Sequence, residues 1–241
     1  MQIWNDPRAS TRLRKWLYLL IAVCLLVSLG KFVLQASLFP VKQIQINGKL
    51  KHISQDQLQF VAQNKVIGDT LTLDLNQVKN SFEELSWIKE AEAKRHWPDT
   101  LEITIVEKKA IARWKEGGLV DSDGNWFEAN TDEELPIFDG PKGSESQMKL
   151  MYEELTKTLQ PEQLKVKALY LTDRNAWQVR LDNDILLKLG TDDALKRVDM
   201  LKTVWRKYLE AQASDIEYID LRYSNGFALK MRSEPDKPVL G

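Results

Sequence analysis

Residues of the types that catalyse reactions or bind metals are few in this sequence and do not form a recognised set. Asp121, Asp123 and Asn125 occupy alternate positions, as the first ligands of a calcium-binding loop do. Trp126 then occupies the sixth loop position, where the sharp turn of such a loop requires glycine. The Asp123-Gly124 dipeptide before Trp126 instead predicts a β-hairpin turn.

The remaining candidates for chemistry are also weak. Two histidines, His52 and His96, and one cysteine, Cys24, leave few ways to build a metal centre from nitrogen and sulfur ligands. A lone cysteine also excludes an intramolecular disulfide bond. The sequence contains no phosphate-binding loop, dinucleotide-binding glycine motif or nucleophile elbow. We therefore predict no catalytic residue, no metal site and no cofactor.

Composition indicates a folded protein of one large or two small domains. The chain has 241 residues, of which 43% are hydrophobic and 29% charged, whereas disordered chains contain fewer apolar residues. Its 34 basic and 35 acidic side chains nearly cancel, giving a formal net charge of -1. This balance does not indicate a nucleic-acid partner, and no motif indicates a small-molecule substrate.

The first forty residues predict a membrane anchor. Residues 16–30 carry no charge, and the apolar composition continues to Phe39 after a single Lys31. The longer stretch, 16–39, reaches roughly 36 Å as a helix, enough to cross the ~30 Å hydrocarbon core with some tilt. Lys31 lies toward the far end, where its long side chain reaches the headgroups.

Charge around this stretch predicts its orientation. The segment 1–15 carries one acidic side chain, Asp6, and four basic side chains, Arg8, Arg12, Arg14 and Lys15. Such basic segments stay on the cytoplasmic side. A cleavable signal peptide and a lipoprotein signal before Cys24 are the alternatives. Leu34 and Val23 stand where small residues are needed for those cleavages, so we expect an uncleaved anchor.

The pattern of residues 40–110 predicts a small α+β domain with the order strand, helix, helix, strand, strand. The signals Ser54-x-x-Gln and Asp74-x-x-Gln are typical starts of two short amphipathic helices. Strands at about 87–96 and 101–105 follow, joined by a Trp-Pro-Asp turn. Two helices on one face of a three-stranded sheet would make a compact unit.

Residues 111–233 predict a mostly antiparallel β domain with flanking helices, and 234–241 a flexible tail. Short alternating apolar runs separated by turns indicate the strands. A long helix capped by Thr191 is expected to turn Trp205 and Tyr208 inward.

The last predicted strand, residues 227–232, suggests two interpretations. A strand at the end of a chain often lies at a sheet edge, where its backbone groups are open to another chain. Lys230 and Arg232 are either charges that prevent such pairing or charges that flank a site where a partner adds a strand. The residues alone leave both interpretations open.

Several blocks of the sequence resemble the FtsQ/DivIB family of bacterial cell-division proteins. The resemblance covers essentially the whole chain and rests on FPVKQIQINGKLKHIS, WIKEAEAKRHWPDTLEITIVEKKAIARW, LVDSDGNWF, AWQVRLDNDILLKLGTDDALKRV and IEYIDLRYSNGFALK. It implies a POTRA domain and then a β domain in a single-pass inner-membrane protein at the division septum. It further implies an essential, non-catalytic scaffold that links early and late division proteins and controls septal peptidoglycan synthesis.

The resemblance also implies partners and site residues. FtsB and FtsL are the partners expected at the last strand of the β domain, and FtsK and other division proteins those expected at the POTRA domain. The residues assigned to partner binding by position are Arg174, Arg222, Tyr223, Asn225, Gly226, Phe227, Leu229 and Lys230. This sequence departs from the family's usual residues at two of the positions considered. Ala110 stands where the family often has proline after the POTRA domain, and Asn225 stands where it often has serine.

Two other classes of function stay open at this point. One is an assembly chaperone of the cell envelope, which normally has repeated POTRA-type units or an attached barrel. The other is a membrane-anchored periplasmic enzyme, which needs a cleft holding an acid or a nucleophile with a shifted pKa.

Overall fold

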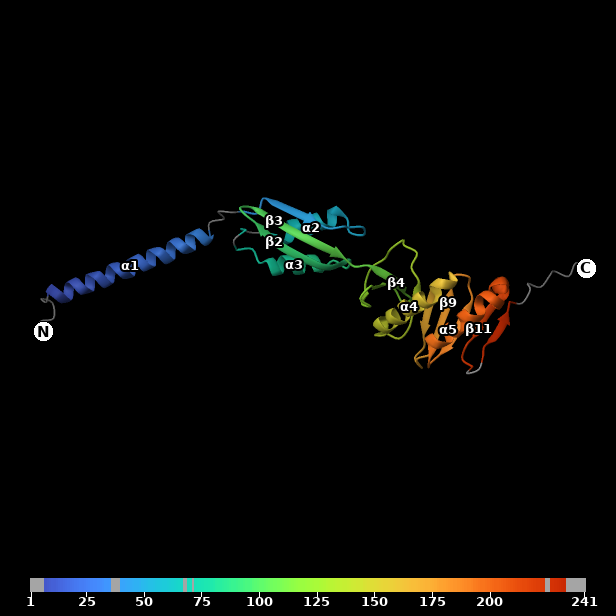
Figure 1. The fold of residues 1–241 in the computed structure, drawn as a ribbon. Helices are drawn as coiled ribbons and strands as arrows, with labels where there is room; N and C mark the ends of the chain where they lie inside the picture. The colour runs from blue at the N-terminus through green and yellow to red at the C-terminus, as the bar shows by residue number, and fades with distance from the viewer. Residues whose placement is uncertain (1–6, 36–39, 67–68, 71, 224–225, 233–241) are drawn as a thin grey trace, which may run out of the picture. The chain divides into compact units, whose positions relative to one another are not determined.

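The computed structural model describes residues 7–35, 40–66, 69–70, 72–223 and 226–232 (Figure 1). The chain divides into two compact units, Met1–Glu107 and Lys108–Gly241, each with its own core. The predicted tail at 234–241 and the end of the predicted membrane span at 36–39 lie outside the described residues.

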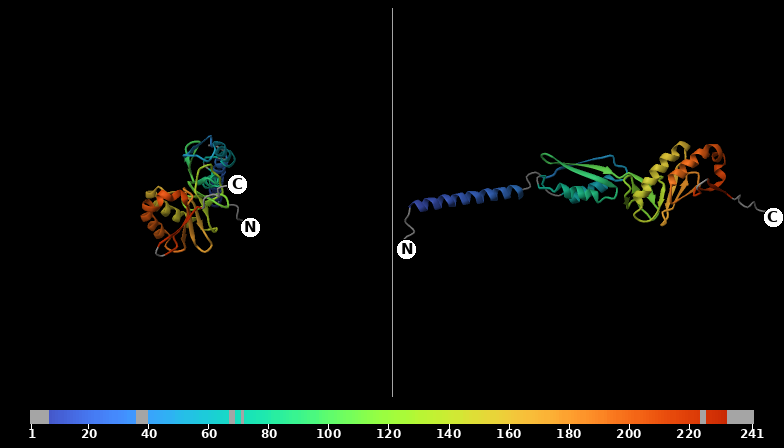
Figure 2. Two further views of the ribbon diagram at one scale, coloured as in Figure 1. Left: turned by 90° about the vertical axis from the view of Figure 1, so that its right-hand side faces the viewer. Right: turned by 60° about the horizontal axis from the view of Figure 1, so that its bottom comes forward.

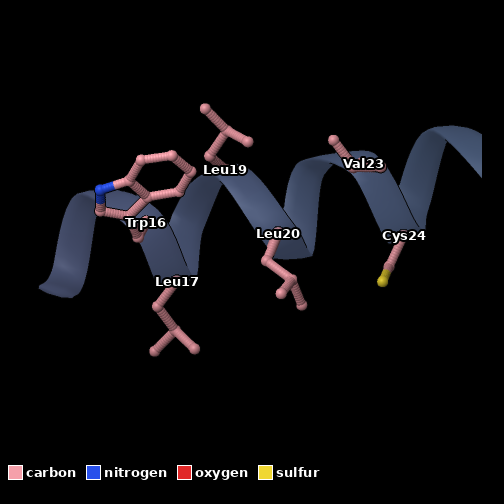
Figure 3. Close-up of a pocket in the computed structure, with 6 residues that line it drawn as sticks. All are labelled: Trp16, Leu17, Leu19, Leu20, Val23 and Cys24. Carbon is pink, nitrogen blue, oxygen red and sulfur yellow. The ribbon is translucent and has the colours of Figure 1, made fainter.

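The N-terminal helix α1, Pro7–Gln35, is apolar over a length that suits a membrane. Its apolar stretch, Arg14–Phe32, has 19 residues and measures roughly 28 Å, close to the thickness of the hydrocarbon core. Large side chains such as Trp16 and Leu20 project from the helix and are 70% and 60% exposed (Figure 3). A helix that is apolar all round requires an apolar surrounding, so α1 is consistent with a membrane anchor.

The rest of the first unit is a three-stranded sheet with two helices. It contains β1 (Gln43–Asn47), α2 (Gln55–Lys65), α3 (Leu75–Glu83), β2 (Ile88–His96) and β3 (Thr100–Glu107). β3 lies in the centre, parallel to β1 and antiparallel to β2. The order of these elements along the chain, strand, helix, helix, strand, strand, is the one that the sequence predicts.

Side-chain caps start both helices of this unit. Ser54 accepts a hydrogen bond from the Gln57 backbone, and the Gln57 side chain accepts one from the Ser54 backbone, which confirms the predicted capping box. Asp74 accepts from the backbone N–H groups of Asn76 and Gln77. The helices bury their apolar sides against one face of the sheet, in a core that includes Leu58, Ala62, Val78, Phe82, Leu101, Ile103 and Ile105.

The second unit is a nine-stranded mixed sheet whose order is β12-β11-β10-β9-β8-β7-β4-β5-β6. The strands are β4 (Ala110–Trp114), β5 (Leu119–Asp121), β6 (Trp126–Phe127), β7 (Ile137–Asp139), β8 (Val166–Leu171), β9 (Trp177–Leu181), β10 (Leu186–Gly190), β11 (Ile216–Asp220) and β12 (Ala228–Met231). The fold therefore belongs to the predicted α+β class. Three neighbouring pairs are parallel, two of them through β7, a strand that the sequence analysis does not predict.

Helices cover one face of this sheet (Figure 2). They are α4 (Glu145–Leu159) and α5 (Ala194–Val204), which share a core with the strands. Met148, Leu155 and Val198 are fully buried there.

The start and end of α5 differ from the prediction. The residue at the N-cap is Asp193, with φ of 51° and no side-chain capping bond, so Thr191 does not cap the helix. A π-helical turn, Trp205–Leu209, follows α5. Because a π turn adds residues per turn, it changes which side chains face the core. Leu209 is buried and Tyr208 is 56% exposed, so the inward placement predicted for Tyr208 is wrong.

The hairpin between β5 and β6 explains the calcium-like spacing. Asp121 is buried, and its Oδ1 accepts hydrogen bonds of 2.9 Å from the backbone N–H groups of Asp123 and Asn125. Gly124 has φ of 84°, a conformation that favours glycine. The carboxylate therefore stabilises the predicted turn.

Candidate functional site

The C-terminal strand β12 forms one edge of the nine-stranded sheet. It pairs antiparallel with β11, with Tyr218 opposite Lys230 and Ile219 opposite Leu229. All four residues of β12 are exposed. Edge strands offer backbone donors and acceptors to another chain unless something covers them, so β12 is the first candidate for a binding site.

The backbone of β12 has a definite orientation toward this edge. The N–H of Arg232 donates to the carbonyl of Asp215 at 2.6 Å, and thus points toward β11. In an antiparallel pair, successive residues direct their N–H and C=O groups alternately toward and away from the partner strand. The register shift between Ile216 and Tyr218 places its extra residue on β11, so β12 itself keeps this alternation. The backbone groups of Lys230 therefore face β11, and those of Leu229 and Met231 face the free edge.

The apolar side chains of β12 lie on the face of the sheet that the helices cover. Leu229 is opposite Ile219, and Met231 is opposite Ile216, and both partners are buried in the core. Leu229 and Met231 themselves remain 42% and 44% exposed. Two apolar side chains at the rim of the core are thus left for another surface to cover.

The opposite face of this edge is cationic and aromatic. Tyr218 lies between two lysines, with Lys188 Nζ 3.6 Å and Lys230 Nζ 5.7 Å from the centre of its ring. Lys230 also forms an ion pair of 2.9 Å with Glu217, whose hydrogen bond raises the pKa of that ammonium group. The Lys230 ammonium group therefore stays protonated at physiological pH.

A buried carboxylate fixes an arginine just after β11. Asp220 is 5% exposed and accepts hydrogen bonds from Arg222 Nε at 2.8 Å and from Arg222 Nη2 at 2.6 Å. These bonds lower the pKa of Asp220 and raise that of Arg222. The Arg222 side chain is nonetheless 58% exposed. Its guanidinium group is thus held in one position while part of it faces solvent.

The strand register places Arg174 at the same end of the sheet as Arg222. Arg174 is exposed in the turn between β8 and β9, next to the pair formed by Leu171 and Trp177. Trp177 is paired with Gly190 at the end of β10, and β10 runs parallel to β11, which ends just before Arg222. The structure therefore brings two arginines that are far apart in sequence to one end of the sheet.

The other residues assigned by resemblance occupy different environments. Tyr223 is 58% exposed, whereas Phe227 packs partly against the core. Nothing lies within 4 Å of a Cβ atom built on Gly226, so sterics do not require glycine there. Asn225 lies outside the described residues.

Sequence reasoning missed two residues of this edge. Met231 continues the alternation of Leu229 by one step, but the block that carries the resemblance stops at Lys230. Period-two spacing would have identified it. No sequence pattern indicated a binding role for Tyr218, because its contact with Lys188 depends on the parallel pairing of β10 with β11.

Within the described parts of the chain, no group of three histidine, cysteine, aspartate or glutamate residues is arranged to hold a metal ion. The acidic residues of the edge, Glu217 and Asp220, are each paired with a cation. The chemistry offered here is backbone pairing, apolar contact and positive charge.

Comparisons with known proteins match both units. The sequence profile for the FtsQ-type POTRA domain matches residues 39–108, and the profile for the C-terminal region of cell division protein FtsQ/DivIB matches residues 112–222. The chain is similar to cell division protein FtsQ of Neisseria gonorrhoeae, at 32% identity over 97% of this chain and 96% of the relative. It is also similar to FtsQ of Escherichia coli, at 32% identity over 91% of this chain and 84% of the relative.

Proposed function

Because the chain belongs to the FtsQ/DivIB family of bacterial cell-division proteins, we propose that β12 is the edge on which it binds a partner in the division machinery. The family is a non-catalytic component of that machinery, so the edge acts by binding alone. The observation that carries the proposal is the open backbone of Leu229 and Met231 beside two uncovered apolar side chains.

An extended partner segment would add a tenth strand to the sheet. Its backbone would pair with the outward N–H and C=O groups of Leu229 and Met231, which fixes the register. Its apolar side chains would cover Leu229 and Met231 on the helix side, and Tyr223 would add exposed aromatic area at the end of the sheet. Tyrosine is enriched among residues that dominate interface energies.

Charge defines which segment fits. The described cations at this edge are Lys188, Arg222, Lys230 and Arg232, with Arg174 at the same end of the sheet. Glu217 and Asp220 offset two of these five charges, so the set stays net positive and the partner should supply acidic residues next to apolar ones. We assign this segment to FtsB, with FtsL in the same subcomplex.

The POTRA domain would serve a separate contact. In this proposal it helps recruitment to the septum through FtsK and other division proteins, while the β domain binds FtsB and FtsL. The chain would then be an essential scaffold that links early and late division proteins and controls septal peptidoglycan synthesis.

The proposed topology follows from the anchor. Residues 1–15 are cytoplasmic, 16–39 cross the inner membrane, the POTRA domain and the β domain follow with their boundary close to residue 110, and 234–241 form the tail. The basic side chains before the apolar stretch support this orientation. Both folded domains are then periplasmic, and the protein is a single-pass type II membrane protein at the division septum.

Site-specific photo-crosslinking in growing cells tests the proposal. A benzophenone amino acid at Leu229 of the full chain should crosslink to FtsB, because the partner's side chains would cover this side chain on the helix side of the sheet. The same probe at Tyr208, which is 56% exposed in the same domain, is the matched control and should not. Crosslinking from Tyr208 alone, or from neither position, would rule out β12 as the site.

A further inference from the structure

The turn between β2 and β3 presents an exposed tryptophan at one end of the POTRA sheet. This turn, Trp97–Asp99, lies beside the start of β1, because Lys42 and Gln43 both donate backbone hydrogen bonds to the Asp99 carbonyl, at 2.9 and 3.3 Å. Lys42 Nζ also lies 3.3 Å from Asp99 Oδ2. The tip of the hairpin is therefore fastened to the segment by which the chain enters the domain.

Chain length keeps this tip close to the membrane anchor. Helix α1 ends at Gln35, and Lys42 follows it by seven positions. Such a segment spans at most roughly 25 Å even when fully extended. If the membrane span runs to Phe39, only Pro40 and Val41 separate it from Lys42. The tip lies within reach of the bilayer surface in either case.

The side chains at the tip suit a lipid headgroup region. Trp97 is 59% exposed, and its indole combines a large apolar ring with one polar N–H group, the combination that is enriched at membrane surfaces. Lys42 has a side chain that is 68% exposed, and its ammonium group, which has three N–H donors, can bind a phosphate oxygen while it stays beside Asp99. The acidic side chains nearby are compensated, because Asp99 pairs with Lys42 and Glu102 accepts a hydrogen bond from His96 at 2.6 Å.

We propose that this hairpin tip, consisting of Trp97–Asp99 and Lys42, docks on the outer leaflet of the membrane that holds α1. The indole of Trp97 enters the headgroup layer, and Lys42 lies at the phosphates. The occupant is a lipid surface and not another protein, because the covalent link to the anchor brings that surface to the tip. The POTRA domain is then held at two points, its linker and its tip, which limits how it tilts above the membrane.

This inference rests on the proposed insertion of α1 but is independent of partner binding by β12. The test uses the full chain in lipid nanodiscs, labelled with 5-fluorotryptophan, with a gadolinium chelate on the headgroup of a fraction of the lipids. Each fluorine resonance is assigned by the signal that disappears in a tryptophan-to-phenylalanine variant. Trp97→Tyr gives a second assignment of the critical signal if Trp97→Phe does not fold.

Three tryptophans make the result decisive. Trp16 lies in α1 and reports on insertion of the anchor. Trp87 precedes β2 and Trp97 follows it, so nine strand residues separate them by roughly 30 Å within one domain. Trp87 thus controls for a domain that merely moves close to the bilayer on its linker.

The expected result is that the signals of Trp16 and Trp97 lose most of their intensity and that of Trp87 does not. Equal loss at Trp97 and Trp87, or no loss at Trp97, would overturn tip docking while leaving the anchor intact. No loss at Trp16 would overturn the insertion of α1 and the docking with it. None of these outcomes bears on partner binding by β12.

Discussion

A proline at Leu229 should weaken partner binding without unfolding the β domain. The N–H of Leu229 points to the free edge of β12, so proline removes a donor that the added strand would use and leaves the bonds to β11 in place. Edge strands tolerate proline when the missing N–H faces away from the sheet. The substitution therefore separates pairing with the partner from the internal stability of the sheet.

The expected loss can be worked out from one missing hydrogen bond. A backbone hydrogen bond contributes about 1 kcal/mol net, and a partner carbonyl left buried without a donor costs about 1–3 kcal/mol. A total near 2 kcal/mol corresponds to roughly a 30-fold rise in Kd. Leu229→Pro also removes the leucine side chain. Leu229→Ala keeps the N–H group, so it measures separately the loss of affinity that is due to the side chain.

The assay is titration of the full-length protein in nanodiscs with the FtsB–FtsL complex, together with the Tm of each variant. Lys230→Pro is the matched control, because the N–H of Lys230 faces β11. It should lower Tm, whereas Leu229→Pro should raise Kd and leave Tm nearly unchanged. If Leu229→Pro binds as well as Leu229→Ala, the partner does not pair with the backbone of β12.

Three further predictions follow from the site and the caps. Tyr223→Ala should weaken FtsB–FtsL binding by about 1–3 kcal/mol, measured by the same titration, and Tyr208→Ala, at similar exposure, should not. Arg222→Met should lower Tm at pH 7. The bonds from Arg222 lower the pKa of Asp220 in the folded state, so this stabilisation is complete above about pH 4 and disappears as pH falls through the lowered pKa. The Tm values of Arg222→Met and the wild type should therefore converge in acid, and a constant difference down to pH 2 would contradict this. Ser54→Ala should destabilise the POTRA domain by about 1 kcal/mol through loss of the helix cap, measured by urea unfolding, with Ser214→Ala in the other domain as the control.

Features that depend on a few neighbouring residues could be predicted from the sequence. The capping box of Ser54 and Gln57 is local, and it forms as expected. The Asp123-Gly124 hairpin is also local, because Gly124 supplies the positive φ of the turn. Strand alternation likewise identified the last strand, although its position at the sheet edge needed the complete topology.

Features that depend on distant pairing, or on a break in a regular helix, could not be predicted. Strand β7, Ile137–Asp139, has three residues, too few for an alternation to show. The π turn after α5 shifts the buried position from Tyr208 to Leu209, and a regular helical period cannot show such a shift. Which backbone groups of β12 face outward is known only from the bond between Arg232 and Asp215.

Residue-resolved amide hydrogen exchange tests the central claim most directly. In the free protein, the N–H groups of Leu229 and Met231 should exchange rapidly, while that of Lys230, directed at β11, exchanges slowly. Addition of the FtsB–FtsL complex should then protect Leu229 and Met231. Binding without any gain of protection at these two positions would contradict the account, because the partner would then occupy a surface other than the edge of β12.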